Sequence, residues 1–279
     1  MRTLLYRPVT FGGLLVLCLA FAPARRVTGD RELVGHPSAL PPAASAGPAA
    51  RSFAELCRDD PVEAIARSMR KYKAEVEGYS CILVKRERIN GELRDPEVIA
   101  CDFQEAPFAV IMRWVEGKAR AEAMLYAAGQ NGDQLLIVPA SDLGKSALKL
   151  IGRTYAKRAL TSEDAKSASR YPANQFGIYC GTARVYDAWK AAHERGALRT
   201  EYEGVRPIPE MNGRPCHVLR RNCLVPEEDG LTQVTILFDA ETHFQVGAVL
   251  MAGAELIGRY YFRDLRLNPK FDALHFSAE

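Results

Sequence analysis

The feature of the sequence that most constrains its fold is a series of short strand-like segments with apolar side chains on both faces. In YSCILVKRERI, residues 79–89, Cys81 and Leu83 share one face, and other apolar residues occupy the opposite face, because successive side chains of a strand point to opposite sides. The segments 108–115 and 245–251 show the same pattern. Antiparallel sheets usually leave one face in water, so other parts of this chain must cover both faces.

Turn residues divide the chain into successive strands. Asn90-Gly91 and Asn131-Gly132 predict tight hairpins, because both residues of such turns favour a positive φ. We expect neighbouring strands to pair in sequence and antiparallel. The predicted strands are residues 79–89, 97–104, 108–115, 120–127, 134–139, 147–151, 198–203, 215–222, 233–239, 245–251 and 255–263.

Two amphipathic helices are expected beside these strands. The first begins at Pro61, with Asp59 or Asp60 as its N-cap, and is stopped by Gly78. The second spans roughly residues 178–195, where apolar residues recur at helical spacing. Helix, strands, helix, strands is the element order of an α+β protein.

The predicted fold is therefore α+β: a strongly curved antiparallel sheet, or half-barrel, with helices in its concave face. Such cover explains why strands are apolar on both sides in the middle and charged at their ends. The first half of segment 79–89 would lie beneath a helix. Lys85, Arg86, Glu87 and Arg88 would emerge at the solvated rim.

The N-terminal region predicts export. Arg2 and Arg7 accompany an apolar run over residues 11–22, which is shorter than the roughly 20 residues of a membrane span. Ala22-Pro23-Ala24 matches a signal cleavage pattern. The predicted organisation is a signal peptide over residues 1–24, a Pro/Ala-rich flexible linker over 25–57 and a single domain over 58–279. The expected location is the periplasm or the cell envelope.

Charge argues against a nucleic-acid partner. The formal net charge is +3 and falls to +1 when Arg2 and Arg7 leave with the signal. A protein that binds nucleic acid needs a pronounced basic surface, so this class is excluded.

The cysteines leave two alternatives open. Beyond Cys18, which follows Leu17 rather than the small residue of a lipidation signal, six cysteines remain in an exported chain. A hairpin through Asn90-Gly91 would place Cys81 nearly opposite Cys101, where a cross-strand disulfide is stereochemically feasible. Free buried thiols are at least as well supported, because a domain of this size does not need disulfides.

No catalytic residue, metal site or cofactor is predicted. The five histidines form no HExxH or HxH grouping. The sequence also contains no GxSxG motif and no Gly-rich phosphate loop. A hydrolase would need carboxylates assembled across the fold, which leaves it as a third hypothesis.

Two kinds of residue are candidates for ligand binding. Arg86 and Arg88 could hold a polar head group at the rim of the sheet. Large aromatic side chains could line a cavity between helices and sheet, and these are Trp114, Tyr126, Phe238 and Tyr260. The alternative is that the charged run is a solvated strand end and that the aromatic residues are ordinary core.

Four blocks of the sequence resemble a known family. They are GYSCILVKRERINGEL, RYPANQFGI, MNGRPCHVL and YYFRDLRLNPKFDALHF. The chain resembles the secreted bacterial domain of unknown function fifteen-seventy-one, from Ala64 to Phe276. The most specific pieces are Lys85-Arg86-Glu87 with Asn90-Gly91, and Arg170-Tyr171-Pro172.

This resemblance implies a fold and no activity. The family is similar in fold to periplasmic lipoprotein carriers and outer-membrane lipoprotein-sorting proteins, in which a curved half-barrel holds acyl chains in an apolar hollow. It transfers no binding residue to this chain. Residues 118–132 depart from the family pattern before the predicted turn.

The leading hypothesis is an exported, non-catalytic protein that binds a hydrophobic or amphipathic ligand in the concave face of the half-barrel. Its partners would be a lipid or a lipidated protein, with only peripheral contact with a membrane surface, and the chain would be a monomer. The alternative is a structural or protein-interaction module whose interior is filled by its own side chains.

Overall fold

The computed structural model describes residues 41, 51–117 and 121–278. The predicted signal peptide and most of the predicted linker lie outside the described residues. The linker was expected to reach residue 57, but helix α1 (Phe53–Asp59) buries three side chains in the core. The helix starts here because the Ser52 hydroxyl accepts from the Glu55 amide, while the Glu55 carboxylate accepts from the Ser52 amide.

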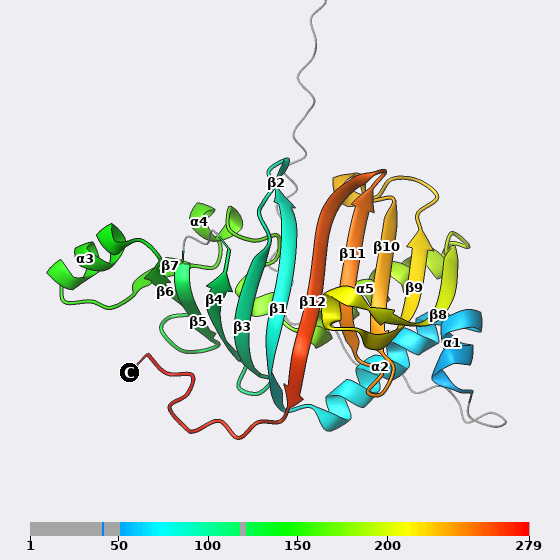
Figure 1. Cartoon of the computed structure of the whole chain (residues 1–279), viewed down its shortest axis with the longest axis horizontal. Coiled ribbons are helices and arrows are strands. Elements are labelled where there is room, and N and C mark those ends of the chain that lie inside the picture. Colours follow the sequence, from blue (N-terminus) through cyan, green and yellow to red (C-terminus); the bar gives the residue numbers. More distant parts are fainter. Residues whose placement is uncertain (1–40, 42–50, 118–120, 279) are drawn as a thin grey trace, which may run out of the picture. The chain divides into compact units, whose positions relative to one another are not determined.

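Twelve strands in the described residues form one antiparallel sheet made of two meanders (Figure 1). The first meander runs outward from β1 to the edge strand β7, and the second runs from β12 to the other edge strand β8. The strands are β1 (Gly78–Ile89), β2 (Glu92–Leu93), β3 (Glu97–Gln104), β4 (Ala109–Glu116), β5 (Ala121–Ala127), β6 (Gln134–Pro139), β7 (Ala156–Ala159), β8 (Thr200–Ile208), β9 (Arg214–Asn222), β10 (Gln233–Asp239), β11 (Gln245–Ala252) and β12 (Glu255–Leu267).

The first and last long strands join the two meanders. β1 pairs with β12 from Tyr79 opposite Leu267 to Glu87 opposite Gly258. Within each meander, neighbours in sequence are neighbours in the sheet, as predicted. Both hairpin predictions agree with the backbone, because Asn90 and Gly91 have φ of 52° and 82° and the second Asn-Gly pair also has positive φ.

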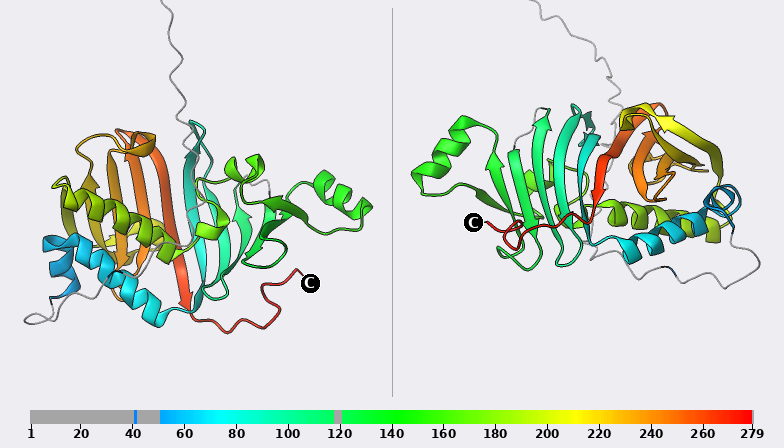
Figure 2. Two further views of the ribbon diagram at one scale, coloured as in Figure 1. Left: turned by 180° about the vertical axis from the view of Figure 1, so that it is seen from behind. Right: turned by 60° about the horizontal axis from the view of Figure 1, so that its bottom comes forward.

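The sheet is strongly curved, and two long helices lie across the concave side of the second meander (Figure 2). They are α2 (Pro61–Glu75), capped by Asp60 as predicted, and α5 (Ile178–Glu194). The core between these helices and the sheet includes Trp189 of α5 together with Phe238 of β10 and Phe244, each at most 1% exposed. The predicted α+β half-barrel with helices in its concave face is therefore confirmed.

An irregular segment covers part of the concave side of the first meander. Residues 160–177, called the covering segment below, contain α4 (Glu163–Lys166) and the 3-10 helix η1 (Ala173–Gln175). Phe176 packs on Phe103 of β3 and Phe262 of β12, with ring centroids 5.7 and 6.0 Å apart. Two further 3-10 helices are η2 (Pro209–Met211) and η3 (Glu228–Gly230).

The C-terminal tail covers the convex face of β4 and β5. Phe276 is buried against Ala109, Ile111 and Ala127, with Phe271 packed beside them. The sequence analysis attributed two-sided burial to helices in the concave face. On β4 the outer face is instead covered by this tail, whose apolar residues are too irregularly spaced to predict a helix or a strand.

The predicted strand at residues 147–151 is wrong. These residues belong to the end of α3 (Asp142–Leu150) and the residue after it. The Ser141 hydroxyl accepts from the Gly144 amide and so caps the helix. The helical spacing of Leu143, Ala147, Leu150 and Ile151 was the missed signal.

Candidate functional site: a buried polar network on the concave face

Lys85 and Glu87 lie buried on the concave face of β1, contrary to the predicted solvated strand end. Lys85 is 7% exposed and Glu87 is 3% exposed. The alternation that buries the first half of β1 continues along the whole strand, so the same face carries both charges. Arg86 and Arg88 point to the opposite face and are half-buried. Buried charges are costly without partners, so the surrounding strands must supply them.

Pairing with both neighbouring strands supplies those partners. Lys85 is directly opposite Glu97 on β3 and Tyr260 on β12. Its ammonium lies 2.7 Å from Glu87 Oε2 and 3.2 Å from Glu97 Oε2. The Tyr260 hydroxyl donates to the other oxygen of Glu87 at 2.7 Å. One cation is thus held between two carboxylates, and three strands fix its position.

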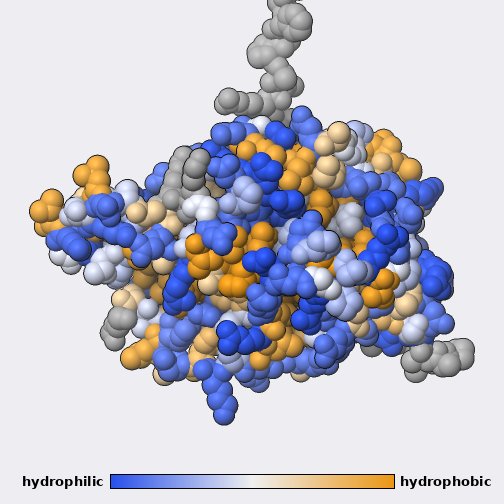
Figure 3. Space-filling view, in the orientation of Figure 1, coloured by the Kyte–Doolittle hydropathy of each residue, from blue (hydrophilic) through white to orange (hydrophobic). Residues whose placement is uncertain are grey.

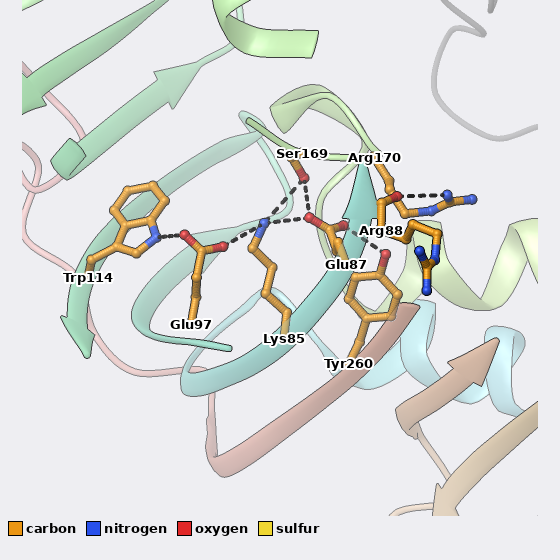
Figure 4. Close-up of polar contacts among 8 residues, drawn as sticks. All are labelled: Lys85, Glu87, Arg88, Glu97, Trp114, Ser169, Arg170 and Tyr260. Carbon is orange, nitrogen blue, oxygen red and sulfur yellow. Dashed lines mark hydrogen bonds and ion pairs between the residues drawn. The ribbon is translucent and has the colours of Figure 1, made fainter. Parts of the chain in front are cut away.

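Trp114 and Ser169 complete the arrangement (Figure 4). The indole Nε1 of Trp114 donates to Glu97 Oε1 at 2.8 Å. Lys85 donates to the Ser169 hydroxyl at 3.5 Å, and this hydroxyl donates to Glu87 Oε2 at 3.3 Å. The polar network, as we call it below, consists of Lys85, Glu87, Glu97, Trp114, Ser169 and Tyr260.

The covering segment is joined to the sheet at the polar network. Beside Ser169, Arg170 donates to the main-chain carbonyl of Arg88 at 3.4 Å and to the Asp229 carboxylate at 2.7 Å. The ring of the next residue, Tyr171, packs beside that of Tyr260 in a tilted orientation, with centroids 6.1 Å apart. Two blocks far apart in sequence, around Lys85 and around Arg170, therefore meet in one site.

Burial and charge act in opposite directions on the ionisable groups of the network. Burial would lower the pKa of Lys85, but the carboxylates of Glu87 and Glu97 outweigh it and raise that pKa. Burial would raise the pKa of Glu87, but the Lys85 charge and the hydrogen bonds from Lys85 and Tyr260 lower it. Burial, together with the Glu87 charge, raises the pKa of Tyr260 well above its usual value. The phenol therefore remains a hydrogen-bond donor.

These pKa directions limit the chemistry of the site. A lysine that activates a serine hydroxyl must be neutral, which requires a lowered pKa. Lys85 is held cationic beside Ser169, and Glu87, with its lowered pKa, is a weak base. The arrangement is suited to fixing strands and the covering segment in place rather than to proton transfer.

An apolar surface adjoins the network along the first meander. On β4, Met112 and Trp114 lie on the concave face, and Met112 is opposite Met124 of β5, which is in turn opposite Ile137 of β6. Both methionines are 8% exposed, whereas Trp114 and Ile137 are only partly buried. We call these four residues the apolar wall. Trp114 belongs to both the wall and the polar network.

The structure brings together two of the six predicted ligand residues and separates the others. Trp114 and Tyr260 meet through the network. Tyr126 lies on the same concave face, buried beside Phe108 at a centroid distance of 5.9 Å. Phe238 lies under α1 in the second meander, where Phe53 packs on it at 5.3 Å.

Arg86 and Arg88 do not face the concave side where the prediction placed a head group. Arg86 donates to the carbonyl of Arg94, and Arg88 donates to the carbonyls of Leu256 and Gly91. Both guanidinium groups thus support the hairpin and the β1–β12 pair from the convex face. The alternation of β1 explains the difference, because Lys85 and Glu87 occupy the inner positions.

The predicted strand register at Cys81 and Cys101 agrees with the structure, but the possible disulfide between them is not formed. Cys81 is directly opposite Cys101, and both are buried free thiols. Burial raises the pKa of Cys81 well above its usual value, and the neighbouring Cys101 adds to the effect. The alternative of free buried thiols is the one that the structure contains.

The sequence held a signal for the missed residues. The register that sets Cys81 opposite Cys101 also sets Lys85 opposite Glu97, four residues further along β1. An inward Lys facing an inward Glu predicts a cross-strand ion pair. Ser169 had no such signal, because it lies in an irregular segment.

No group of three or more His, Cys, Asp or Glu side chains within residues 51–117 and 121–278 is placed to hold a metal ion. His217 instead accepts or donates a hydrogen bond with the Tyr202 hydroxyl at 2.7 Å, and His243 stacks on Phe53 at 4.2 Å. Burial lowers the pKa of both histidines.

Comparison with protein families gives a match over residues 76–279 to the family described as "Protein of unknown function (DUF1571)". The chain belongs to this family. The match includes every residue of the polar network and the apolar wall, and it begins after α2. The sequence has no match among curated proteins.

Several solved structures are similar to this chain at low sequence identity. A DUF1329 family protein from Desulfovibrio piger is 9% identical, with 78% of this chain and 98% of that chain covered and a TM-score of 0.36. Lipoprotein LppX from Mycobacterium tuberculosis is 9% identical, with 77% and 100% covered and a TM-score of 0.41. A LolA superfamily protein from Nitrosomonas europaea is 9% identical, with 77% and 97% covered and a TM-score of 0.30.

Proposed function

We propose that this protein binds an apolar or amphipathic molecule, such as a lipid or the lipid part of a lipidated protein, along the apolar wall of its first meander. Binding would occur without catalysis, in a protein exported to the periplasm or cell envelope by the signal over residues 1–24. The described part of the chain contains no helix that is both long and apolar enough to span a membrane.

The observation that supports this proposal is the unequal packing of the two halves of the concave face. In the half covered by the helices, Trp189 of α5 and the sheet-side residues Phe238 and Phe244 are essentially inaccessible. Along the apolar wall, Trp114 and Ile137 are only partly buried, and the adjacent covering segment carries partly buried apolar residues of its own. An accessible apolar surface in a concave setting is the usual character of a lipid or small-molecule site.

The polar network suits one end of an amphipathic ligand. Among its three charged side chains, that of Glu97 is 22% exposed, whereas those of Lys85 and Glu87 are almost completely buried. A head group that donates hydrogen bonds would therefore meet Glu97 beside Trp114, while the apolar chain followed Met112 and Met124. Lys85, 3.2 Å from Glu97 Oε2, would hold that side chain in position.

The balance of charges and donors in the network supports binding without catalysis at this site. Each carboxylate of the network is engaged by Lys85 and by at least one neutral donor. The Ser169 hydroxyl has only a cationic lysine and a weakly basic carboxylate beside it, so it lacks the base that a nucleophilic mechanism needs.

Native mass spectrometry tests the proposal. The protein is delipidated in denaturant, refolded, incubated with a bacterial envelope lipid extract and analysed. The wild type should carry acyl-containing mass. I137E places a charge on the apolar wall and should lose that mass. V249E places the same charge at a partly buried position on the convex side of β11 and should retain it.

Two results would count against lipid binding at the wall. One is a wild type that stays free of acyl mass in extracts of varied composition. The other is equal loss of the bound mass in I137E and V249E, with both variants folded by circular dichroism, because the wall would then have no special role.

A second candidate function is a protein-interaction module with a filled interior, and the tight packing under α2 and α5 favours it. The Trp114→Ala variant separates the two. A fully packed core should lose about 3–5 kcal/mol of unfolding free energy. A ligand-lining position should lose less than about 2 kcal/mol in the unliganded protein, because part of the indole is already exposed.

A further inference from the structure

Helix α3 presents its apolar face to solvent. Leu143, Leu150 and Ile151 are 83%, 88% and 64% exposed, and no residue of the helix is buried. Leu143 and Leu150 are two turns apart, with Ala147 between them, so they share one face. An amphipathic helix of a globular protein normally turns this face to the core. Figure 3 shows hydrophobic groups at the end of the molecule where α3 projects.

Contacts on its other face hold α3 in this orientation. Lys145 forms an ion pair with Glu122 of β5. The helix also approaches β6 closely at Gly144, where an added Cβ would lie 2.8 Å from the Cβ of Pro139. The outward direction of the leucines is therefore set by packing, and the helix projects beyond the β6–β7 edge of the sheet (Figures 1 and 2).

Basic residues outnumber acidic residues in α3 and in the segment that follows it. Residues 141–158 contain five basic residues and one acidic residue. Lys149, Arg153 and Lys157 are exposed and form no ion pair with any carboxylate in the described part of the chain. The net charge of this segment alone is +4, compared with a formal net charge of +3 for the whole chain, so positive charge is concentrated here.

We propose that α3 docks the protein onto an anionic lipid bilayer, with Leu143, Leu150 and Ile151 in the acyl region and Lys149 and Arg153 among the head groups. A short helix with aliphatic residues on one face and cations beside them fits an interfacial position. The patch is a projection rather than a groove, so it suits a deformable apolar medium. The positive charge selects negatively charged lipid surfaces, and salt weakens the attraction.

Vesicle sedimentation of the full-length chain tests this inference. One set of vesicles contains phosphatidylcholine alone, and the other contains phosphatidylcholine with phosphatidylglycerol at three parts to one. The wild type should bind the anionic vesicles roughly tenfold more tightly than the neutral ones at low salt. L143D/L150D should weaken this binding by roughly tenfold or more.

Matched variants separate α3 from other parts of the chain. L224D/V225D changes two other exposed apolar residues, 61% and 69% exposed, and should bind within about twofold of the wild type. K149E/R153E keeps the leucines and should lose the preference for anionic vesicles. Because all variants share the same N-terminal region, the comparison also controls for any contribution from that region.

Three results would overturn the inference. They are equal binding of the wild type to both vesicle types, binding by L143D/L150D equal to that of L224D/V225D, and a vesicle-free dimer of the wild type that L143D/L150D converts to a monomer. The last would show that a second copy covers α3. The inference does not depend on ligand binding at the apolar wall, and I137E should still bind the anionic vesicles.

Discussion

Removal of the buried cation is the sharpest test of the polar network. In K85M, methionine fills most of the lysine volume but leaves Glu87, at 3% exposed, without its counter-charge. The carboxyl group then has to take up a proton on folding. Its pKa in the unfolded chain is about 4.3, so keeping it neutral at about pH 7 costs nearly three pKa units. At about 1.4 kcal/mol per unit, the expected loss is about 3–4 kcal/mol, within the range for a broken buried pair.

The loss should depend on pH in a defined direction. Without Lys85, the folded-state pKa of Glu87 rises above its unfolded value, so the folded state binds more protons and the variant gains stability as the pH falls. In the wild type the pKa of Glu87 is lowered, and its contribution persists down to acidic pH. The difference in unfolding free energy between wild type and K85M should therefore shrink to about 1 kcal/mol at about pH 5.

Urea denaturation followed by far-ultraviolet circular dichroism measures this difference at several pH values. K85M/E87Q should recover at least half of the loss, since the buried charge is gone. K166M, which removes a lysine from the exposed pair with Glu163, serves as control and should change stability by about 0.5 kcal/mol or less. A loss below about 1 kcal/mol in K85M at neutral pH, or a loss that does not change with pH, would refute the electrostatic explanation.

Two further predictions concern the packing around the site. G177A adds a methyl group at a residue with φ of 115°, 3.3 Å from Tyr79 Oη, and should lower the unfolding free energy measured in urea by about 1–3 kcal/mol. G253A adds the same group where no atom lies within 4 Å and should lower it by about 1 kcal/mol. Equal losses in the two variants would contradict the steric argument. Because burial lowers the pKa of His217 and His243, the unfolded state binds more protons, and stability should fall as the pH drops below about 6.5. H217Q/H243N should flatten thermal melting between about pH 6.5 and 5, and an unchanged slope would contradict this assignment.

Local patterns in the sequence were sufficient for most elements. Asp60 and Pro61 specify the start of α2, and the predicted strands at residues 97–104, 134–139 and 233–239 coincide with β3, β6 and β10. These elements are set by turn residues and by side-chain alternation, which act over a few residues.

Features that depend on distant contacts could not be predicted in the same way. The pairing of β1 with β12 joins segments about 180 residues apart, and nothing near Lys85 indicates that Tyr260 will lie beside it. Phe276 covers β4 from an irregular tail with no periodicity. The burial of Lys85 was missed because a run of four charged residues normally indicates a solvent-exposed segment. Here the alternation of β1 turns Lys85 inward, where Glu87, Glu97 and Ser169 accept its hydrogen bonds and ion pairs.

At helix α3 the sequence pattern predicts the secondary structure but not the burial. Its sequence has a good N-cap and helical spacing, yet its apolar side chains are exposed, so the expectation that apolar residues mark the core fails there. The same exposure makes the helix informative, because an apolar face fixed toward solvent indicates a binding surface.

Fluorescence quenching by a dibrominated stearate tests the central claim most directly, because the chain has two tryptophans: Trp114 on β4 of the first meander and Trp189 on α5, which covers the second. W189F leaves only Trp114 on the apolar wall, and W114F leaves only Trp189 of α5, which is buried in the core of the other half. If an acyl chain binds along the wall, the brominated probe should quench W189F in a saturable way and leave W114F unchanged. Quenching of W114F alone, equal quenching of both, or no quenching of W189F would contradict binding at the apolar wall.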